Sequence, residues 1–177
     1  LRENKVMSLK TRFGNLGNIL DFDNLTEENI YVLDSPILTN SQFKKFKKFF
    51  SKKVKIIDCT FNIENSLRER IDSIREEAET AVREGSTCLV LSDKNISNKK
   101  ASIPSILTVG AVHSHLVKHG LRGYCSLNVE CSDAMDTHSF AILIGVGATT
   151  VNPYLAIDSI YQRFEKKLFG KSDFETC

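Results

Sequence analysis

Thr87-Cys-Leu-Val-Leu-Ser-Asp93 is the first of three short runs that decide the fold, and Cys125-Ser-Leu-Asn-Val-Glu130 and Ala148-Thr-Thr-Val-Asn-Pro153 are the others. Each reads as a buried strand that ends in polar residues or in proline. Two longer apolar runs, 103–119 and 138–146, lie between them and have the length of helices. Strand and helix therefore alternate, which predicts a parallel sheet.

The same repeat extends toward the N-terminus. Val54-Lys-Ile-Ile-Asp-Cys-Thr-Phe61 reads as a further buried strand, and residues 62–84 carry apolar side chains at helical spacing before a stop at Gly85. We therefore predict an α/β fold of parallel β/α repeats with its helices on the outer side, forming an incomplete barrel or an open curved sheet. The four adjacent strands are 54–61, 87–92, 125–130 and 148–152.

The chain length and local composition predict one domain over residues 1–177. Within it we expect a wrapping arm over residues 1–40 and the β/α core over residues 41–170. Residues 8–30 have the glycine- and asparagine-rich composition of a loop, and Ile30-Tyr-Val-Leu33 reads as a short strand.

A basic and aromatic helix is predicted from Asn40 to Phe50, behind capping side chains at 39–41. Such a helix can lie on an anionic membrane or grip a phosphate backbone. We favour a core helix with a solvated lysine face, because the chain carries 24 Lys+Arg against 22 Asp+Glu and its charge of +2 suggests no nucleic-acid partner. The expected core residues are Phe43, Phe46, Phe49 and Phe50, and the expected solvated residues are Lys44, Lys45, Lys47 and Lys48.

Five cysteines occur without any Cys-x-x-Cys pair, and three of them fall in predicted strands. We expect reduced, mostly buried thiols in a reducing compartment, cytoplasmic or organellar, and not a secreted protein. No run approaches the roughly 18 apolar residues of a membrane span, and the first residues do not form a signal peptide. A membrane partner is therefore not expected, and we expect the chain to start in the middle of a longer sequence.

Polar residues gather at the predicted strand ends, and in β/α folds this edge holds functional groups. A pair of carboxylates there could act as acid and base. We favour a simpler explanation, because a chain that leaves a sheet needs polar groups that bond to its loops. The residues are Asp58, Thr60, Ser92, Asp93, Glu130 and Asn152.

Three histidines, His113, His115 and His119, lie on one predicted helix, and the last two share a face. A His-x-x-x-His pair is half a zinc site, but Leu116 replaces the glutamate of a metalloprotease motif and spacing reveals no third ligand. We expect packing and helix-end hydrogen bonds, and no metal site.

Gly145-Val-Gly147 lies between a helix and a strand, and a phosphate cradle needs the opposite order. We expect these glycines to end the helix and to allow close packing against the strand.

Several ordered motifs resemble the central domain of glutamate synthase, and together they cover roughly residues 1–160. Members of that family tend to carry a further histidine where this chain has Ser114, and another where it has Ser139. These departures weaken any claim of a fixed histidine cluster. The motifs are Met7-Ser-Leu-Lys-Thr-Arg-Phe-Gly-Asn-Leu-Gly-Asn-Ile-Leu20, Leu33-Asp-Ser-Pro-Ile-Leu38, Leu89-Val-Leu-Ser-Asp93, Ile103-Pro-Ser-Ile-Leu-Thr-Val-Gly-Ala-Val-His113, Ala141-Ile-Leu-Ile-Gly-Val-Gly-Ala148 and Val151-Asn-Pro-Tyr-Leu-Ala156.

The resemblance implies a parent enzyme with a glutamine amidotransferase domain, a central domain, a barrel that binds flavin mononucleotide (FMN) and carries an iron-sulfur cluster, and a C-terminal β-helix. Ammonia from glutamine would travel through the protein to 2-oxoglutarate, and reduction would give L-glutamate. The electrons would come from NADH, NADPH or ferredoxin, through a possible electron-donating subunit or domain. The sequence does not distinguish these donors.

The central domain would then be a degenerate relative of the FMN barrel that links the amidotransferase and FMN domains, with no catalytic residue, cofactor or metal of its own. The fragment alone would be inactive. We expect a set of polar residues to face a neighbouring domain or the ammonia route. A free-standing β/α enzyme or small-ligand-binding domain that uses the strand-end polar residues is the alternative. The expected residues are Ser92, Asp93, Glu130, His138, Asn152 and Tyr154.

Overall fold

A computed structural model of the chain describes residues 8–13 and 31–170. The chain divides into two compact units, residues 1–36 and residues 37–177. Of the expected arm over residues 1–40, residues 37–40 thus belong to the larger unit. Residues 14–30 of the loop predicted over residues 8–30 lie outside the described residues.

The smaller unit contains an antiparallel pair, β1 (Thr11–Phe13) and β2 (Tyr31–Leu33). The strand expected at 30–33 is confirmed over its described residues. The expectation of a loop throughout 8–30 is wrong for residues 11–13, which form β1. This strand was missed because three residues are too few to show a periodic pattern. Phe13 and Leu33 are both buried, so the pair has an apolar side of its own.

Four parallel strands form the central sheet of the larger unit, in the order β3-β5-β7-β8. They are β3 (Val54–Asp58), β5 (Cys88–Ser92), β7 (Ser126–Glu130) and β8 (Thr150–Asn152). This confirms the predicted parallel sheet of adjacent strands. Every residue of β5 is buried, as its continuous apolar run requires. Among the described strands, β3 pairs only with β5 and so forms an edge of the sheet, and at the other edge Ile37 bridges to Val151 of β8.

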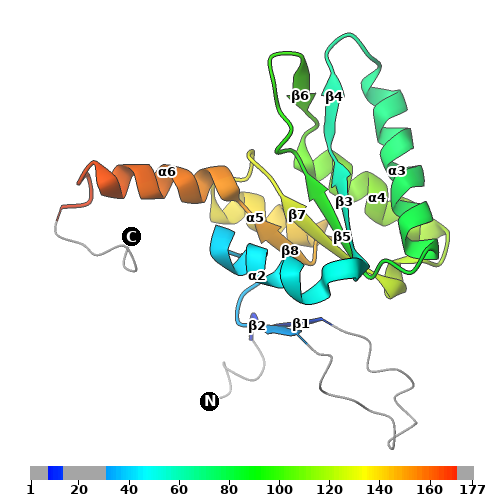
Figure 1. Cartoon of the computed structure of the whole chain (residues 1–177), viewed down its shortest axis with the longest axis horizontal. Coiled ribbons are helices and arrows are strands. Elements are labelled where there is room, and N and C mark those ends of the chain that lie inside the picture. The colour runs from blue at the N-terminus through cyan, green and yellow to red at the C-terminus, as the bar shows by residue number, and fades with distance from the viewer. Residues whose placement is uncertain (1–7, 14–30, 171–177) are drawn as a thin grey trace, which may run out of the picture. The chain divides into compact units, whose positions relative to one another are not determined.

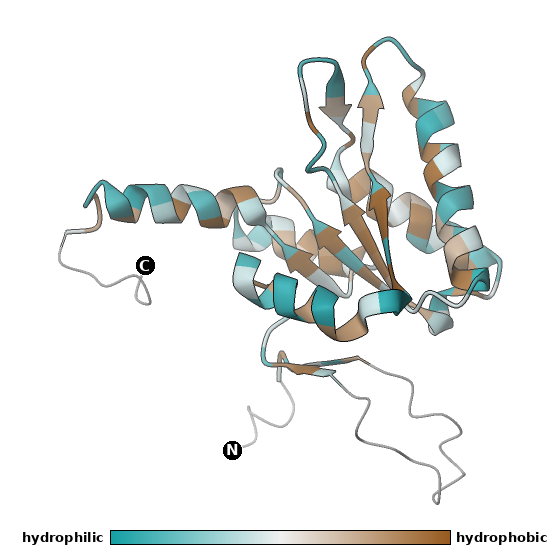
Figure 2. Ribbon diagram, viewed as in Figure 1, coloured by the Kyte–Doolittle hydropathy of each residue, from teal (hydrophilic) through white to brown (hydrophobic). Residues whose placement is uncertain are grey.

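Three helices cover one face of this sheet: α3 (Leu67–Arg83), α4 (Ser105–Lys118) and α5 (Thr137–Gly145). Their apolar residues pack with Ile57, Leu91, Val129 and Val151, which occupy one row across the four strands. Figure 2 shows this apolar concentration in the strands, with polar residues along the outer side of α3. The core therefore lies between the sheet and these helices.

Helix α2 (Asn40–Phe50) lies on the opposite face, because Lys47 reaches Glu130, a residue whose side chain alternates with that of Val129. The three helices that join the strands lie on one side of the sheet, as predicted, and α2, which precedes the first strand, covers the other side. A capping box starts this helix: Thr39 Oγ1 accepts from the Gln42 backbone N–H at 3.3 Å, and Gln42 Oε1 accepts from the Thr39 N–H at 2.9 Å.

The aromatic face of α2 differs from the expected one. Phe43 and Phe46 are buried, but Phe49 is 49% exposed, and Lys47 is half-buried with its ammonium group 4.7 Å from the centre of the Phe43 ring. At about 100° per residue, Lys47 lies only about 40° from Phe43 around the helix, whereas Phe49 lies about 120° away. Lys47 therefore belongs to the packed face, while Lys44, Lys45 and Lys48 are exposed as expected.

The strand predicted over 54–61 ends at Asp58. The Asp58 carboxylate accepts hydrogen bonds from the Thr60 N–H at 2.9 Å and from its hydroxyl at 2.8 Å, a turn that leads the chain out of the sheet. Residues 60–62 then form β4 (Thr60–Asn62), which pairs antiparallel with β6 (Lys100–Ser102). The sequence Lys-Ala-Ser of β6 shows no alternation of apolar and polar residues, so this strand was not predicted.

Among residues 8–13 and 31–170, the remaining elements are two short 3₁₀ helices, η3 (Ser51–Lys53) and η4 (Arg122–Tyr124), and the helix α6 (Tyr154–Glu165). Of the residues of α6, only Ala156 is buried, and the helix extends away from the sheet (Figure 1). None of the helices within 8–13 and 31–170 has the length and apolar character needed to cross a membrane.

Candidate functional site

The carboxyl ends of the four parallel strands carry a row of polar residues. The register pairs Asp58 with Ser92, Ser92 with Glu130, and Glu130 with Asn152. Residues in register point to the same face of a sheet. The structure therefore brings together four of the strand-end residues expected from the sequence, on the face that α2 covers.

Glu130 is the centre of this row and is 3% exposed. Its Oε1 lies 2.9 Å from Lys94 Nζ and 3.2 Å from Lys47 Nζ, and its Oε2 accepts a hydrogen bond from the Ser92 hydroxyl at 2.8 Å. Burial by itself would raise the pKa of Glu130, but the bonds from Lys94 and Ser92 and the charge of Lys47 outweigh it and lower that pKa. Glu130 is thus a buried carboxylate held ionised by two lysines.

Asp93 follows Ser92 and is also buried, at 3% exposure. Its Oδ2 accepts hydrogen bonds from the Ser132 N–H at 2.9 Å, the Ser132 hydroxyl at 2.6 Å and the Ser102 hydroxyl at 3.2 Å. Its Oδ1 is buried with no hydrogen-bond partner among the described residues. Within the same part of the chain, no lysine, arginine or histidine forms an ion pair with Asp93.

Tyr154 and Asn152 complete the site on the side of β8. Burial, followed by the proximity and charge of the Asp93 carboxylate, raises the pKa of Tyr154 to about 12. Lys94 Nζ lies 4.9 Å from the centre of the Tyr154 ring. Asn152 Nδ2 donates to the Leu38 carbonyl at 2.9 Å and to Asn40 Oδ1 at 3.0 Å, so it ties the start of α2 to β8.

His138 is the expected site residue that the structure does not bring into this group. It is exposed in the first turn of α5, two residues after the helix cap Asp136. No hydrogen bond or ion pair joins it to the other five expected residues within the described chain.

Lys47, Lys94, Ser102 and Ser132 belong to the site but were not predicted from the sequence. A signal existed for Lys47, whose i+4 spacing from Phe43 places it on the buried side of α2. Lys94 and Ser132 directly follow Asp93 and Cys131, so a wider definition of the strand ends would have included them. Ser102 comes from β6, an element that the sequence pattern does not predict.

Acid–base chemistry by these carboxylates would require a lone pair that faces a substrate. Both oxygens of Glu130 are occupied by internal donors, and those of Asp58 accept from Thr60 and Asn95. A polar cavity of about 460 Å³ lies beyond the end of β3, and its lining includes Asp58, Arg70 and Lys100. The described strand-end carboxylates thus have the environment of structural groups, and Asp93 Oδ1 is the exception.

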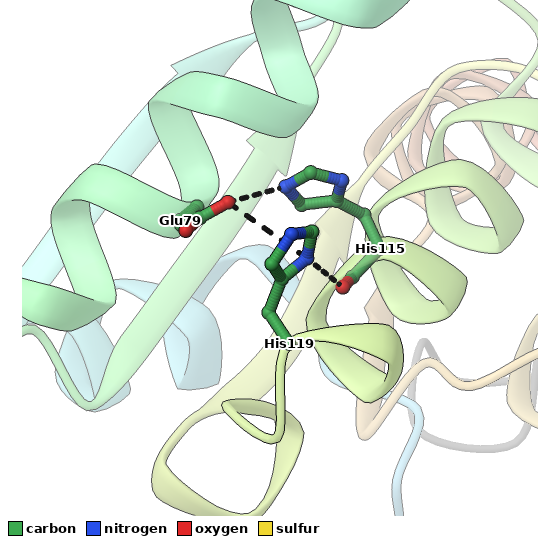
Figure 3. Close-up of side chains that lie close together, drawn as sticks. All are labelled: Glu79, His115 and His119. Carbon is green, nitrogen blue, oxygen red and sulfur yellow. Dashed lines mark hydrogen bonds and ion pairs between the residues drawn. The ribbon is translucent and has the colours of Figure 1, made fainter.

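The helix α4 histidines lie apart from this edge and fall into two environments. His113 Nδ1 accepts from Arg122 Nε at 3.1 Å, and Arg122 also donates to the Gly147 carbonyl at 2.9 Å. His115 Nε2 lies 2.7 Å from Glu79 Oε2 of α3, and His119 Nδ1 lies 2.9 Å from the His115 carbonyl oxygen (Figure 3). The packing and helix-end hydrogen bonds expected from the sequence are both present.

Gly147 lies two residues beyond the end of α5 and helps to close it, because its N–H donates to the Ile144 carbonyl at 3.0 Å and that of Ala148 donates to the Leu143 carbonyl at 2.9 Å. A Cβ atom at Gly147 would lie 2.4 Å from Nδ1 of His113. The helix stop is therefore as expected, but the close packing is against α4 and not against the strand.

Burial raises the pKa of the thiols of Cys59, Cys88 and Cys131 to about 12, and it also raises the pKa of Cys125. All four are free and buried, as expected of structural thiols, while Cys177 lies outside the described residues.

Fold and site together define a parallel α/β domain whose strand-end polar residues bond mainly to one another and to the surrounding loops and helices. Residues 1–176 match the family model described as the glutamate synthase central domain. The chain belongs to this family, as its motifs suggested.

Named relatives agree with this assignment. The chain is 47% identical over 99% of its length to the glutamate synthase [NADPH] large chain of Azospirillum brasilense. It is 38% identical over 92% of its length to the chloroplastic ferredoxin-dependent glutamate synthase of Spinacia oleracea, and 35% identical over 94% to the glutamate synthase [NADPH] large chain of Bacillus subtilis. These matches span 12%, 10% and 11% of the relatives' own lengths, so the chain corresponds to a small part of each.

Proposed function

We propose that this chain is the non-catalytic connecting domain of a glutamate synthase, the enzyme that makes L-glutamate from glutamine and 2-oxoglutarate. The observation that carries the proposal is the match of residues 1–176 to the central-domain family, within relatives of which the match covers only 12% and 10%. Its partners are the amidotransferase and FMN domains of the same chain, and the parent's FMN and iron-sulfur cluster lie outside this fragment. The names of the relatives give NADPH or ferredoxin as their electron donor. For the parent of this chain, we keep NADH as a third candidate.

The four-stranded sheet fits a sector of a degenerate barrel within the parent chain. An edge strand such as β3 leaves room for further strands at the side of the sheet. The buried thiols suit a reducing compartment, cytoplasmic or organellar.

A connecting role is supported by the way that the strand-end charges are used. Lys47 of α2, Lys94 of the β5 loop and Glu130 of β7 form one ionic group that joins three segments. Such a group fixes loops relative to the sheet, and removing one partner of a buried pair is strongly destabilising. In the parent enzyme, we expect this rigidity to hold neighbouring active sites in register beside the ammonia route.

Asp93 is the best candidate for contact with another domain. Its Oδ1 is buried without a hydrogen-bond partner among the described residues, and leaving such an oxygen unpaired costs about 1–3 kcal/mol. An N–H or O–H group from a neighbouring domain would satisfy this oxygen if docking shifts the loops that cover it, since Asp93 is 3% exposed in the isolated chain. The adjacent Tyr154, Ser92 and Asn152 lie at the same loop-bearing edge, where β/α folds place their contacts.

The test is the coupling of the two half-reactions in the full-length enzyme. Asp93→Asn keeps the shape of the side chain but weakens the acceptor, so we expect more glutamine hydrolysed per glutamate formed than in the wild type. Glutamine hydrolysis and ammonia-dependent glutamate formation, each measured alone, should stay close to wild-type rates. Lys45→Ala, which changes an exposed residue of α2, is the matched control.

Substitutions at Glu130 and Asn152 extend this experiment to the rest of the row. If the ratio of glutamine hydrolysed to glutamate formed stays at the wild-type value for Asp93→Asn, Glu130→Gln and Asn152→Ala alike, these residues have no coupling role. The domain would then act as a passive spacer.

The rival proposal is a free-standing domain that binds a small ligand, and the 460 Å³ polar cavity beside the end of β3 favours it. The length of the parent reading frame separates the two proposals. A frame that continues into an FMN barrel supports the connector, and a frame that ends with this domain supports the rival.

A further inference from the structure

Three side chains with metal-binding atoms converge between α3 and α4, on helix faces away from the strand-end site. His115 and His119 are one turn apart on α4, and their ring centres are 4.3 Å apart. Glu79 of α3 extends its carboxylate toward both rings (Figure 3). One ligand atom from each residue lies within 4.8 Å of the other two. We propose that these residues bind a single Zn²⁺ ion, with water as the fourth ligand.

The chemistry of the donors suits this ion. Two imidazole nitrogens and one carboxylate oxygen are a common three-residue set for zinc, with bonds of about 2.0–2.2 Å. Tetrahedral coordination at those lengths separates ligand atoms by about 3.3 Å. The present separation is 2.7 Å between Glu79 Oε2 and His115 Nε2, and a ligand nitrogen of His119 lies within 4.8 Å of the other two ligand atoms. Rotation of the two imidazole rings would bring these separations toward the tetrahedral value without moving either helix.

Neighbouring groups already orient these ligands. Arg83 donates to Glu79 Oε1, from Nε at 2.9 Å and from Nη2 at 2.8 Å, which leaves Oε2 to face the histidines. The His115 carbonyl oxygen can only accept, so His119 Nδ1 carries the proton of that contact and Nε2 keeps its lone pair. Partners of this kind fix ring tautomers and carboxylate orientation in metal sites.

The location is accessible to an ion from solution. The side chains of Glu79, His115 and His119 are 22%, 19% and 35% exposed. Glu79 and His115 are 36 residues apart in sequence, so a bound ion would join two helices across a long segment of chain. Closing such a segment restricts the unfolded chain, and binding to the folded state alone stabilises that state. The ion would therefore act as a clip between α3 and α4, independently of the connecting role proposed above.

The test is a calorimetric titration of the metal-free 177-residue chain with Zn²⁺, in a Cys177→Ser background that removes the C-terminal thiol. We expect one ion per chain and a higher melting temperature with Zn²⁺ than with EDTA. Co²⁺ used in place of Zn²⁺ should give the visible bands of a tetrahedral site with nitrogen and oxygen ligands. Strong near-ultraviolet thiolate absorption would instead place the metal on cysteine and overturn the proposal.

Single substitutions assign the ligands. His115→Ala, His119→Ala and the isosteric Glu79→Gln should each weaken Zn²⁺ binding by at least about tenfold. A loss of about tenfold is the smallest that is typical even for residues that contact the metal ligands and not the metal itself. His138→Ala also removes one histidine, but from the exposed start of α5, and should leave binding unchanged. Melting in EDTA shows whether each variant is folded. Folded His115→Ala and His119→Ala variants that bind Zn²⁺ as the wild type does, or a wild-type chain without stoichiometric binding, would contradict the proposal.

Discussion

Gly147 has φ +121°, a conformation that side-chain-bearing residues rarely adopt, and it lies against the ring of His113. We predict that Gly147→Ala lowers the free energy of unfolding by about 1–3 kcal/mol, the range for strained backbone, with a further loss if the His113 ring is displaced. Urea denaturation measures the change.

Gly145→Ala is the matched control for Gly147→Ala, since a Cβ at Gly145 meets nothing within 4 Å and that residue ends α5 in an ordinary helical conformation. Alanine there should be neutral, or stabilising by about 0.5–1 kcal/mol. Equal losses from the two variants would argue against a special role for the Gly147 conformation.

The buried carboxylate of Glu130 makes the free energy of unfolding depend on pH. Its pKa is lowered in the folded state, so its contribution to stability is present above the pKa of the unfolded chain and is lost as pH falls through the folded pKa. We predict that Glu130→Gln destabilises the chain at pH 7 and that the difference from wild type shrinks as pH falls below about 4, near the usual glutamate value. Urea unfolding at a series of pH values measures this.

Glu165→Gln removes an exposed carboxylate at the end of α6 and is the control for Glu130→Gln. The free energy of unfolding of this variant should stay close to that of the wild type at every pH. A Glu130→Gln difference that stays constant from neutral to acidic pH would mean that packing, and not the charge of the carboxylate, is responsible.

At the scale of elements, α2 offers a direct comparison of aromatic residues on one helix. Phe46 is fully buried, between Phe43 at 6.0 Å and Phe50 at 4.9 Å between ring centres. We predict that Phe46→Ala costs about 3–5 kcal/mol, because it leaves a cavity as well as losing apolar burial. Phe49→Ala, at the half-exposed position, and Lys45→Ala should each cost much less. Thermal and urea unfolding of the three variants would refute this assignment if the losses were similar.

The central sheet could be predicted because its signal is local. Each strand is a short apolar run, and the alternation with helices fixes its parallel direction. β4 and β6 depend instead on a turn formed by Asp58 and on pairing across residues 63–99, and no short window of sequence contains that information. The face of the sheet that α2 covers could not be predicted, because the pattern of this helix defines an apolar side but not the layer against which it packs.

The residues of the candidate site could likewise be predicted only in part. Ser92, Asp93, Glu130 and Asn152 could be grouped in advance, because parallel strands end at one edge of a sheet. The partners that set their chemistry could not, since Lys47 comes from α2 and Ser102 from β6. Glu79, the third residue of the proposed zinc site, likewise becomes a neighbour of His115 only when α3 packs on α4.

At the scale of the whole molecule, we predict that the purified chain is colourless and inactive. Apart from the buried Asp93 Oδ1, the oxygens of its described strand-end carboxylates are engaged in internal bonds, and its described thiols are buried with raised pKa values, so we expect neither group to act in catalysis. Assays of glutamine hydrolysis and of glutamate formation should read background. A stoichiometric flavin absorbance would instead favour a free-standing enzyme.

The edge strand β3 also affects the behaviour of the chain in solution. A strand edge has unpaired N–H and C=O groups that can recruit a strand from another copy, and Ile56 on β3 is 53% exposed. Lys52, Lys53 and Lys55 surround this edge and are all exposed. Like charges on two copies oppose the pairing of two such edges; Lys52 and Lys53 supply this charge, while Lys55 pairs with Glu77 at 3.5 Å. Repulsion at β3 therefore disfavours aggregation, although the net charge of the whole chain is only +2.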